Sequence, residues 1–160
     1  MHVGPLINDD AVAKVREHVA DAARRGATVA FGGSSVELKG LSRRFFSPTI
    51  LADATAEMLV AREETFGPVA PLFRFRDEQE AIRLANDSPY GLAAYFYTRD
   101  ASRLIRVAEA LDYGIVGAND ALPATAQAPF GGVKHSGFGR EGGHEGVMEY
   151  VETKFVSWGV

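Results

Sequence analysis

Hydrophobic and polar positions along this chain change between a helical period and a strand period. Residues 9–25 predict a helix, because apolar residues recur on one face of this stretch and Gly26 supplies a stop. Acidic starts at Asp77 and Asp100 predict two further helices, and Gly114 is expected to close the second of these. Short apolar and β-branched runs predict strands at residues 28–31, 45–51, 69–75, 91–97, 115–118 and 153–158.

This alternation of strands and helices is typical of βαβ units. It predicts an α/β fold with a mostly parallel sheet that is covered by helices on both faces. Residues 119–146 interrupt the rhythm with two prolines and seven glycines, and a last helical turn is expected at residues 147–150. Irregular segments of this length are usually functional loops or disordered.

Composition narrows the class of protein. The chain has 160 residues, with 17 basic and 21 acidic side chains and a net charge of −4. Without a lysine or arginine run we expect no nucleic-acid partner. Without a long apolar stretch or a signal peptide we expect no membrane partner and a cytoplasmic location. The absence of cysteine excludes disulfides, thiolate metal sites and a cysteine nucleophile from this chain.

Two letter patterns in the irregular segment have structural interpretations. Residues 137–142 match the dinucleotide fingerprint G-x-G-x-x-G, but they lack the preceding hydrophobic strand and the acidic residue about 20 positions later. Ser136 follows His135 without a G-x-S-x-G context, so we interpret it as a turn serine. The spacing of the four histidines predicts no metal site: His2, His18, His135 and His144.

A second motif combines acidic, aromatic and turn residues. Residues 63–69 read Glu-Glu-Thr-Phe-Gly-Pro-Val. A carboxylate such as that of Glu64 can accept hydrogen bonds from both vicinal hydroxyls of a ribose, and Phe66 can offer a flat apolar wall to an aromatic ring. Taken alone, the motif also fits a charged helix end followed by a Gly-Pro turn.

Together with residues 129–142, Pro-Phe-Gly-Gly-Val-Lys-His-Ser-Gly-Phe-Gly-Arg-Glu-Gly, this motif resembles the C-terminal signatures of the NAD(P)-dependent aldehyde dehydrogenases. The likeness covers nearly the whole chain and matches the C-terminal third of such an enzyme. The subgroup that it resembles most is the succinate-semialdehyde dehydrogenases. Three further stretches carry the likeness: residues 66–75, 85–96 and 106–114.

The resemblance implies roles for individual residues. It implies that Glu64 binds the nicotinamide ribose, that Phe66 packs beside the nicotinamide and that Phe130 lines the aldehyde pocket. Glu141 would be a carboxylate linked through water to the general base. It further implies that residues 1–150 belong to the catalytic domain, with 119–146 as the active-site loop segment, and that residues 151–160 form an oligomerisation strand in a homo-oligomer.

The resemblance also suggests a substrate, a small aldehyde such as succinate semialdehyde or a similar carboxy-aldehyde. Succinate-semialdehyde dehydrogenases typically place a serine six positions before the pocket phenylalanine, where it holds the substrate's carboxylate. Here that position is Ala124, followed by Thr125. A lost hydrogen bond to a charged group is worth roughly 1.5–3 kcal/mol, so the substrate preference is open.

No catalytic residue is expected within the chain itself. The family's nucleophilic cysteine, general-base glutamate, oxyanion-hole asparagine and Rossmann domain have no counterpart here. Aldehyde oxidation needs a nucleophile close to the carbonyl and a bound nicotinamide to accept the hydride. The chain alone is therefore predicted to be inactive and to bind NAD or NADP weakly or not at all. The alternative is a free-standing, non-catalytic oligomerisation module derived from the same family.

Overall fold

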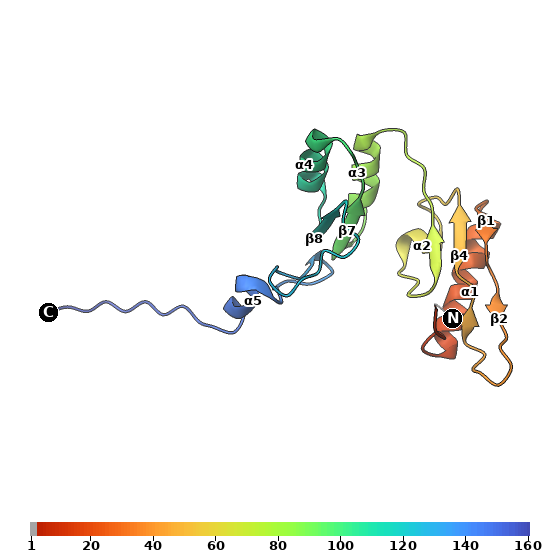
Figure 1. Cartoon of the computed structure of the whole chain (residues 1–160), viewed down its shortest axis with the longest axis horizontal. Coiled ribbons are helices and arrows are strands. Elements are labelled where there is room, and N and C mark those ends of the chain that lie inside the picture. Colours follow the sequence, from red (N-terminus) through yellow and green to blue (C-terminus); the bar gives the residue numbers. More distant parts are fainter. Residues whose placement is uncertain (1–2) are drawn as a thin grey trace. The chain divides into compact units, whose positions relative to one another are not determined.

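The computed structural model describes residues 3–160, so His2 lies outside the described residues. The chain divides into two compact units, residues 1–75 and 76–160, and each is described by itself. Figure 1 labels the elements of both units. Within residues 3–160 no helix is long and apolar enough to cross a lipid bilayer.

The first unit packs one long helix against a small sheet. Its helix begins as the sequence predicts, because the Asn8 side chain accepts a 2.8 Å hydrogen bond from the Ala11 amide. The helix ends before Gly26, which adopts a φ of +100°. The elements of this unit are α1 (Asp9–Arg24), β1 (Thr28–Phe31), β2 (Ser35–Val36), β3 (Phe45–Phe46), β4 (Thr49–Ala52), α2 (Leu59–Arg62) and β5 (Val69–Pro71).

The sheet of the first unit is mixed. Its strand order is β1-β4-β5, with β1 antiparallel and β5 parallel to the central β4. The single strand predicted for residues 45–51 is two strands, because Pro48 has no amide hydrogen to donate to a continuing ladder. β3 instead pairs with β2 in a separate antiparallel hairpin.

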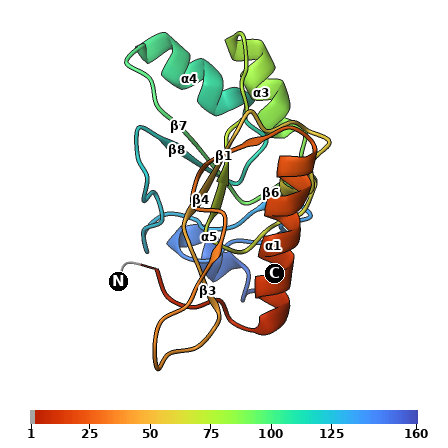
Figure 2. The same ribbon diagram turned by 90° about the vertical axis from the view of Figure 1, so that its right-hand side faces the viewer.

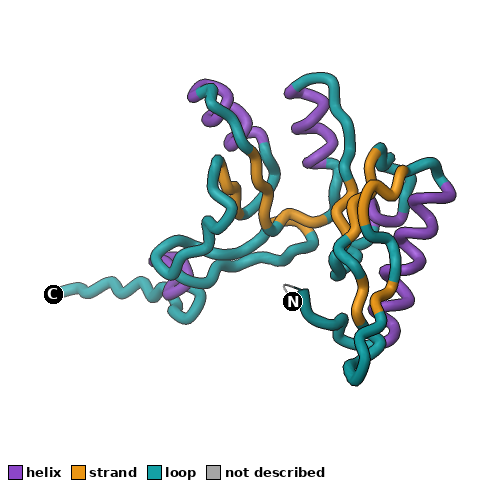
Figure 3. The backbone as a smooth tube through the Cα atoms, turned by 45° about the vertical axis from the view of Figure 1, so that its right-hand side comes forward, coloured by secondary structure: helices purple, strands orange, loops and turns teal. Residues whose placement is uncertain are grey.

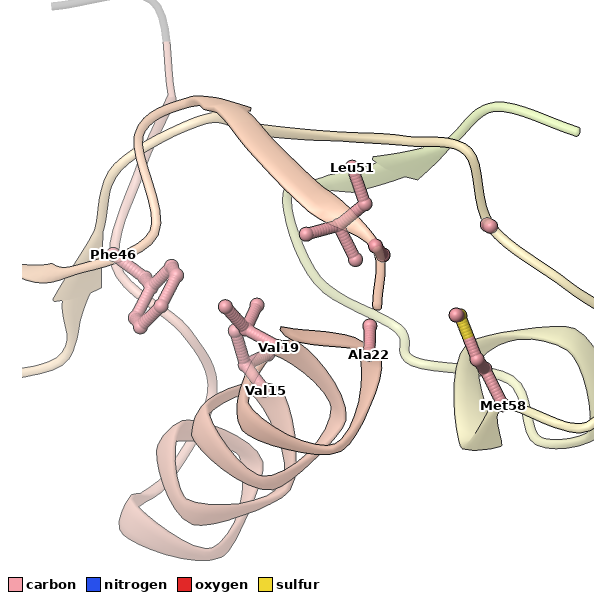
Figure 4. Packing of buried hydrophobic residues seen from close by; sticks show 8 residues of the cluster. Val15, Val19, Ala22, Phe46, Leu51 and Met58 are labelled. Carbon is pink, nitrogen blue, oxygen red and sulfur yellow. The ribbon is translucent and has the colours of Figure 1, made fainter. Parts of the chain in front are cut away.

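The core of the first unit lies between α1 and the sheet (Figure 4). Leu51 of β4 is fully buried and points toward the helix. Met58, just before α2, is also fully buried. The apolar face predicted from the helical spacing supplies the other wall of this core: Val15, Val19 and Ala22. The opposite face of the sheet is open, since Phe31 is 61% exposed.

The second unit contains two helices that lie side by side (Figure 2). Both have the aspartate caps that the sequence predicts, because Asp77 accepts from the Glu80 amide and Asp100 from the Arg103 amide. The elements of this unit are α3 (Glu78–Asn86), β6 (Tyr90–Gly91), β7 (Ala93–Phe96), α4 (Ala101–Ala110), β8 (Ile115–Ala118), β9 (Val133–Lys134) and α5 (Gly143–Met148).

One carboxylate joins these two helices. Glu78 of α3 accepts hydrogen bonds from Arg106 at 2.7 Å and from Arg103 at 2.8 Å, both on α4. The Arg106 guanidinium first, and then that of Arg103, lowers the pKa of Glu78 to about 2. Glu78 therefore stays ionised at neutral pH and fixes α3 against α4.

The strands of the second unit form two separate pairs. β7 and β8 are parallel, whereas β6 and β9 are antiparallel. The prediction of a mostly parallel sheet is therefore not confirmed, since β4–β5 and β7–β8 are the parallel pairs within residues 3–160. The buried strand predicted for residues 91–97 is also corrected: it divides at Leu92, and Tyr95 of β7 is 52% exposed.

The C-terminal part differs from the prediction as well. The last helix, α5, begins at Gly143 and not near residue 147. Residues 151–160 are drawn as loop in Figure 3, and their side chains are exposed. The predicted strand at Thr153–Trp158 is not formed, because a strand needs a partner for its backbone groups and these residues have none within the described chain. Their role as an oligomerisation strand stays a prediction.

Candidate functional site

The segment that carries Glu64 and Phe66, residues 63–68, connects α2 to β5. Both of its ends are held by main-chain hydrogen bonds. The Glu63 amide donates to the Leu59 carbonyl at 2.9 Å, and the Pro68 carbonyl accepts from the Thr49 amide at 2.8 Å. The middle of the segment thus projects between two fixed points of the first unit.

Phe66 has an unusual backbone at this point. Its φ is +48°, in the left-handed region that an aromatic residue rarely adopts, and its side chain is 81% exposed. Glu64 is also exposed, and its carboxylate makes no hydrogen bond or ion pair with another residue in the described part of the chain. A strained aromatic beside a free carboxylate is an arrangement suited to contacting a ligand.

Sequence reasoning missed the side chain that holds this segment from behind. His18 of α1 is 1% exposed, and its Nδ1 lies 2.9 Å from the Thr65 hydroxyl. Its Nε2 lies 3.6 Å from a carboxylate oxygen of Glu63. The signal was present, because position 18 falls on the same helical stripe as Val15 and Val19.

In the second unit, the structure brings Phe130 and Glu141 together. Their backbones form an isolated antiparallel bridge, in which each amide donates to the other's carbonyl at 2.7 Å. The Gly-rich motif therefore folds back on itself as a closed loop. The residue that the resemblance assigns to the aldehyde pocket thus pairs through its backbone with the residue whose carboxylate it expects to be linked through water to the general base.

A shallow pocket of about 320 Å³ lies beside this bridge. Arg140 stiffens its wall, because its guanidinium donates to the carbonyls of Gly132 at 2.9 Å and Gly139 at 2.6 Å. The pocket is lined by Leu92, Phe130, Gly131, Gly132, Ser136, Phe138, Gly139, Arg140, Glu141 and Glu149. Its lining mixes apolar side chains with polar and charged ones: Leu92, Phe130 and Phe138 against Ser136, Arg140, Glu141 and Glu149.

Ala124 and Thr125 do not line this pocket. Both are exposed, and the Thr125 carbonyl accepts from the Ala128 amide at 3.2 Å in a turn just before Phe130. The turn is anchored to the other arm of the loop, because the Gly143 amide donates to the Ala126 carbonyl at 3.1 Å. The two residues therefore stand next to the Phe130–Glu141 bridge in the backbone, with their side chains unengaged.

The residues around this pocket have structural surroundings of their own. Ser136 lies in a turn, in which its amide donates to the Val133 carbonyl at 3.2 Å, and its hydroxyl accepts a 3.0 Å hydrogen bond from the distant Gly91 amide. Residues 137–142 follow β9, which pairs antiparallel with β6, so they do not open a parallel βαβ unit. Among residues 3–160 no group of three His, Asp or Glu side chains is arranged to hold a metal ion.

The site residues thus belong to two sets. Glu64 and Phe66 lie in the first unit, where they could face a ribose and a flat ring. Phe130, Glu141 and the 124–125 turn lie in the second unit, where they could face a small organic substrate. The exposed carboxylate and ring of the first unit and the pocket of the second unit are therefore two separate candidate ligand contacts.

Comparison with known proteins identifies the family of this chain. Residues 1–156 match the model of the aldehyde dehydrogenase family, and the chain belongs to that family. It is 55% identical over 158 residues to the NADP-dependent succinate-semialdehyde dehydrogenase of Escherichia coli, which covers 99% of this chain and 32% of the relative. It is also 55% identical over 153 residues to the glutarate-semialdehyde dehydrogenase of Pseudomonas putida, across 96% of this chain and 31% of the relative.

A solved structure agrees with these relatives. The crystal structure of succinate-semialdehyde dehydrogenase from Burkholderia pseudomallei superposes with a TM-score of 0.87 at 55% identity, over 92% of this chain and 30% of that one. The chain therefore spans about a third of the length of the proteins it matches.

Proposed function

We propose that this chain supplies the nicotinamide-ribose contacts and part of the aldehyde pocket of an NAD(P)-dependent semialdehyde dehydrogenase. The observation that carries the proposal is the pairing of Phe130 with Glu141 in a pocket-forming loop, in a chain that belongs to this family. In the reaction, an aldehyde, water and oxidised cofactor give a carboxylic acid, reduced cofactor and a proton. The nicotinamide, when bound, accepts the hydride.

Glu64 and Phe66 fit the cofactor by their chemistry. The Glu64 carboxylate is exposed and unpaired among the described residues, so it can accept hydrogen bonds from two vicinal hydroxyls without first breaking another contact. The ring of Phe66 is free to lie against a planar heterocycle. Both groups bind and orient, and neither transfers a proton in this proposal.

Phe130 would then provide an apolar wall for the aldehyde, and Glu141 a carboxylate beside it. The substrate class is a short aldehyde that carries a second acidic group, as the names of the relatives from Escherichia coli and Pseudomonas putida indicate. Ala124 has no hydroxyl to hold that acidic group, and Thr125 is the neighbouring residue that could. We expect Thr125→Val to raise the aldehyde KM if it does so.

The chain alone is proposed to be inactive and to bind NAD(P)+ weakly. Two cofactor contacts rarely outweigh the several kcal/mol of translational and rotational freedom lost on binding. The test compares the 160-residue chain with a chimera in which it replaces the matching stretch of the Escherichia coli relative. We expect NADPH formation from succinate semialdehyde by the chimera and none by the chain.

Two results would contradict this proposal. Turnover by the rigorously purified chain would show that it holds a nucleophile of its own. A folded chimera that binds NADP+ but oxidises neither succinate nor glutarate semialdehyde would favour the alternative of a non-catalytic oligomerisation module. A chimera with Glu64→Gln serves as the internal control, since it should raise the cofactor KM and leave the aldehyde KM unchanged.

We also propose that the chain associates with itself. In residues 151–160 the apolar side chains are exposed, with Phe155 at 88% and Trp158 at 86%. Exposed apolar segments with free backbone groups recruit partners. Light scattering at tens of micromolar should find a dimer or larger assembly, and a monodisperse monomer of 17.2 kDa would contradict this.

A further inference from the structure

We infer that His18 is a positioning residue, which holds the 63–68 segment in the conformation that presents Glu64 and Phe66. The inference rests on the proposed function for its cofactor role, but its structural part stands on contacts within the first unit. The imidazole is buried behind the segment and reaches the two residues on either side of Glu64. One nitrogen lies 2.9 Å from the Thr65 hydroxyl and the other 3.6 Å from a Glu63 carboxylate oxygen.

The tautomer of His18 decides which ring nitrogen donates and which accepts. If the proton is on Nε2, it faces the Glu63 carboxylate, and Nδ1 accepts from the Thr65 hydroxyl. Nδ1 then has a hydrogen-bond partner at 2.9 Å, whereas the 3.6 Å separation between Nε2 and Glu63 is a longer, electrostatic contact. Thr65 is thereby hydrogen-bonded to a buried ring that the Glu63 carboxylate also approaches, and the Glu64 side chain between them is left exposed.

The segment needs such a tether because Phe66 is strained. A left-handed φ in a bulky residue is strained and persists only where surrounding contacts stabilise it. The 81% exposed ring of Phe66 has little packing of its own to do so. Its N-terminal neighbour, Thr65, is hydrogen-bonded to His18. On its C-terminal side Gly67 lies so close to Val15 that a Cβ there would be 2.5 Å from the valine methyl. Helix α1 thus contacts both neighbours of Phe66, Thr65 through His18 and Gly67 through Val15.

A second side chain of α1 supports the same region. Asp21, one turn after His18, accepts a 2.9 Å hydrogen bond from the Leu59 amide at the start of α2. A hydrogen bond from Arg25, followed by that from Leu59, lowers the pKa of Asp21, so the carboxylate stays charged. Asp21 therefore fixes where α2 begins, and His18 fixes the segment that follows α2.

The first test uses the 160-residue chain and measures amide hydrogen exchange. His18→Leu should accelerate exchange at the Glu63 and Thr49 amides on the order of tenfold, because the restraint on Thr65 is lost and these amides donate the hydrogen bonds to Leu59 and Pro68 that hold the two ends of the segment. Thr65→Val, which removes only the hydroxyl, should do the same and should add little in the double variant. His18→Asn should restore much of the protection, since its amide group takes the place of Nδ1. Val19→Ala, a core change on the same helix, is the matched control and should not act selectively on the Glu63 and Thr49 amides.

The second test uses the chimera with the Escherichia coli relative. His18→Leu and Thr65→Val should each raise the KM for NADP+ about three- to thirtyfold and leave the aldehyde KM unchanged, with rescue by His18→Asn. Unchanged exchange at the Glu63 and Thr49 amides in both variants would overturn the positioning role. Faster exchange with an unchanged KM for NADP+ would instead overturn the cofactor role of Glu64 and Phe66, so the two failures are distinguishable.

Discussion

Replacing Leu51 by alanine tests whether the first unit has the core described above. Leu51 is fully buried on the central strand β4 and belongs to the cluster that joins α1 to the sheet. Removing a buried leucine side chain costs about 2–5 kcal/mol, depending on how far the surroundings collapse. A unit of this size has a total stability of about 4–11 kcal/mol. We therefore expect Leu51→Ala to remove a large part of the free energy of unfolding.

The assay is urea unfolding followed by circular dichroism. With a denaturant slope of about 1–3 kcal/mol/M, a loss of about 3 kcal/mol moves the midpoint down by about 1–3 M. Hydrogen exchange should locate the loss of protection in residues 3–75. Leu41→Ala is the control, because Leu41 is 56% exposed and a surface change costs about 0.5 kcal/mol or less. A loss under about 1 kcal/mol for Leu51→Ala would refute the assigned core.

Three further predictions concern the second unit. Because the folded pKa of Glu78 is about 2 against an ordinary 4.5, its contribution to stability is complete above about pH 4.5 and is lost as the pH falls toward 2; Glu78→Gln should flatten this dependence in urea unfolding. A Cβ at Gly114 would overlap the Gly131 carbonyl, so Gly114→Ala should cost about 1–3 kcal/mol or more and, in the chimera, raise the aldehyde KM but not the cofactor KM. Deleting residues 151–160 should reduce the particle size in light scattering, and an unchanged size would place the association elsewhere.

Much of the local structure could be predicted because its signals are local. Helix α1 was predicted to within one residue, because a long apolar stripe, the first-turn aspartates and Gly26 all indicate the same bounds. Strands β1 and β8 have the predicted bounds, 28–31 and 115–118. The short helix α2 was anticipated only as a charged helix end before the Gly-Pro turn, because four residues cannot display a helical period.

The parts that sequence reasoning could not supply depend on contacts between distant residues. Strand direction is one, since the antiparallel pairing of β1 with β4 has no signature in either strand alone. The buried contact of His18 with Thr65 joins residues 47 positions apart. The bridge between Phe130 and Glu141 likewise uses main-chain groups, which every residue carries. The roles of Glu64, Phe66, Phe130 and Glu141 came from the family resemblance and stay predictions.

The bridge between Phe130 and Glu141 has a consequence for how substrate preference can diversify. Both of its hydrogen bonds join main-chain atoms, so the loop can keep its register whichever side chains occupy the two positions. Residue 130 can then be replaced by a smaller, larger or polar residue while the backbone of the loop stays the same. Proline is the exception at either position, because each amide is a donor. Libraries that vary positions 130 and 141 together should therefore yield many folded members, and under the proposed function the corresponding chimeras should differ in aldehyde selectivity.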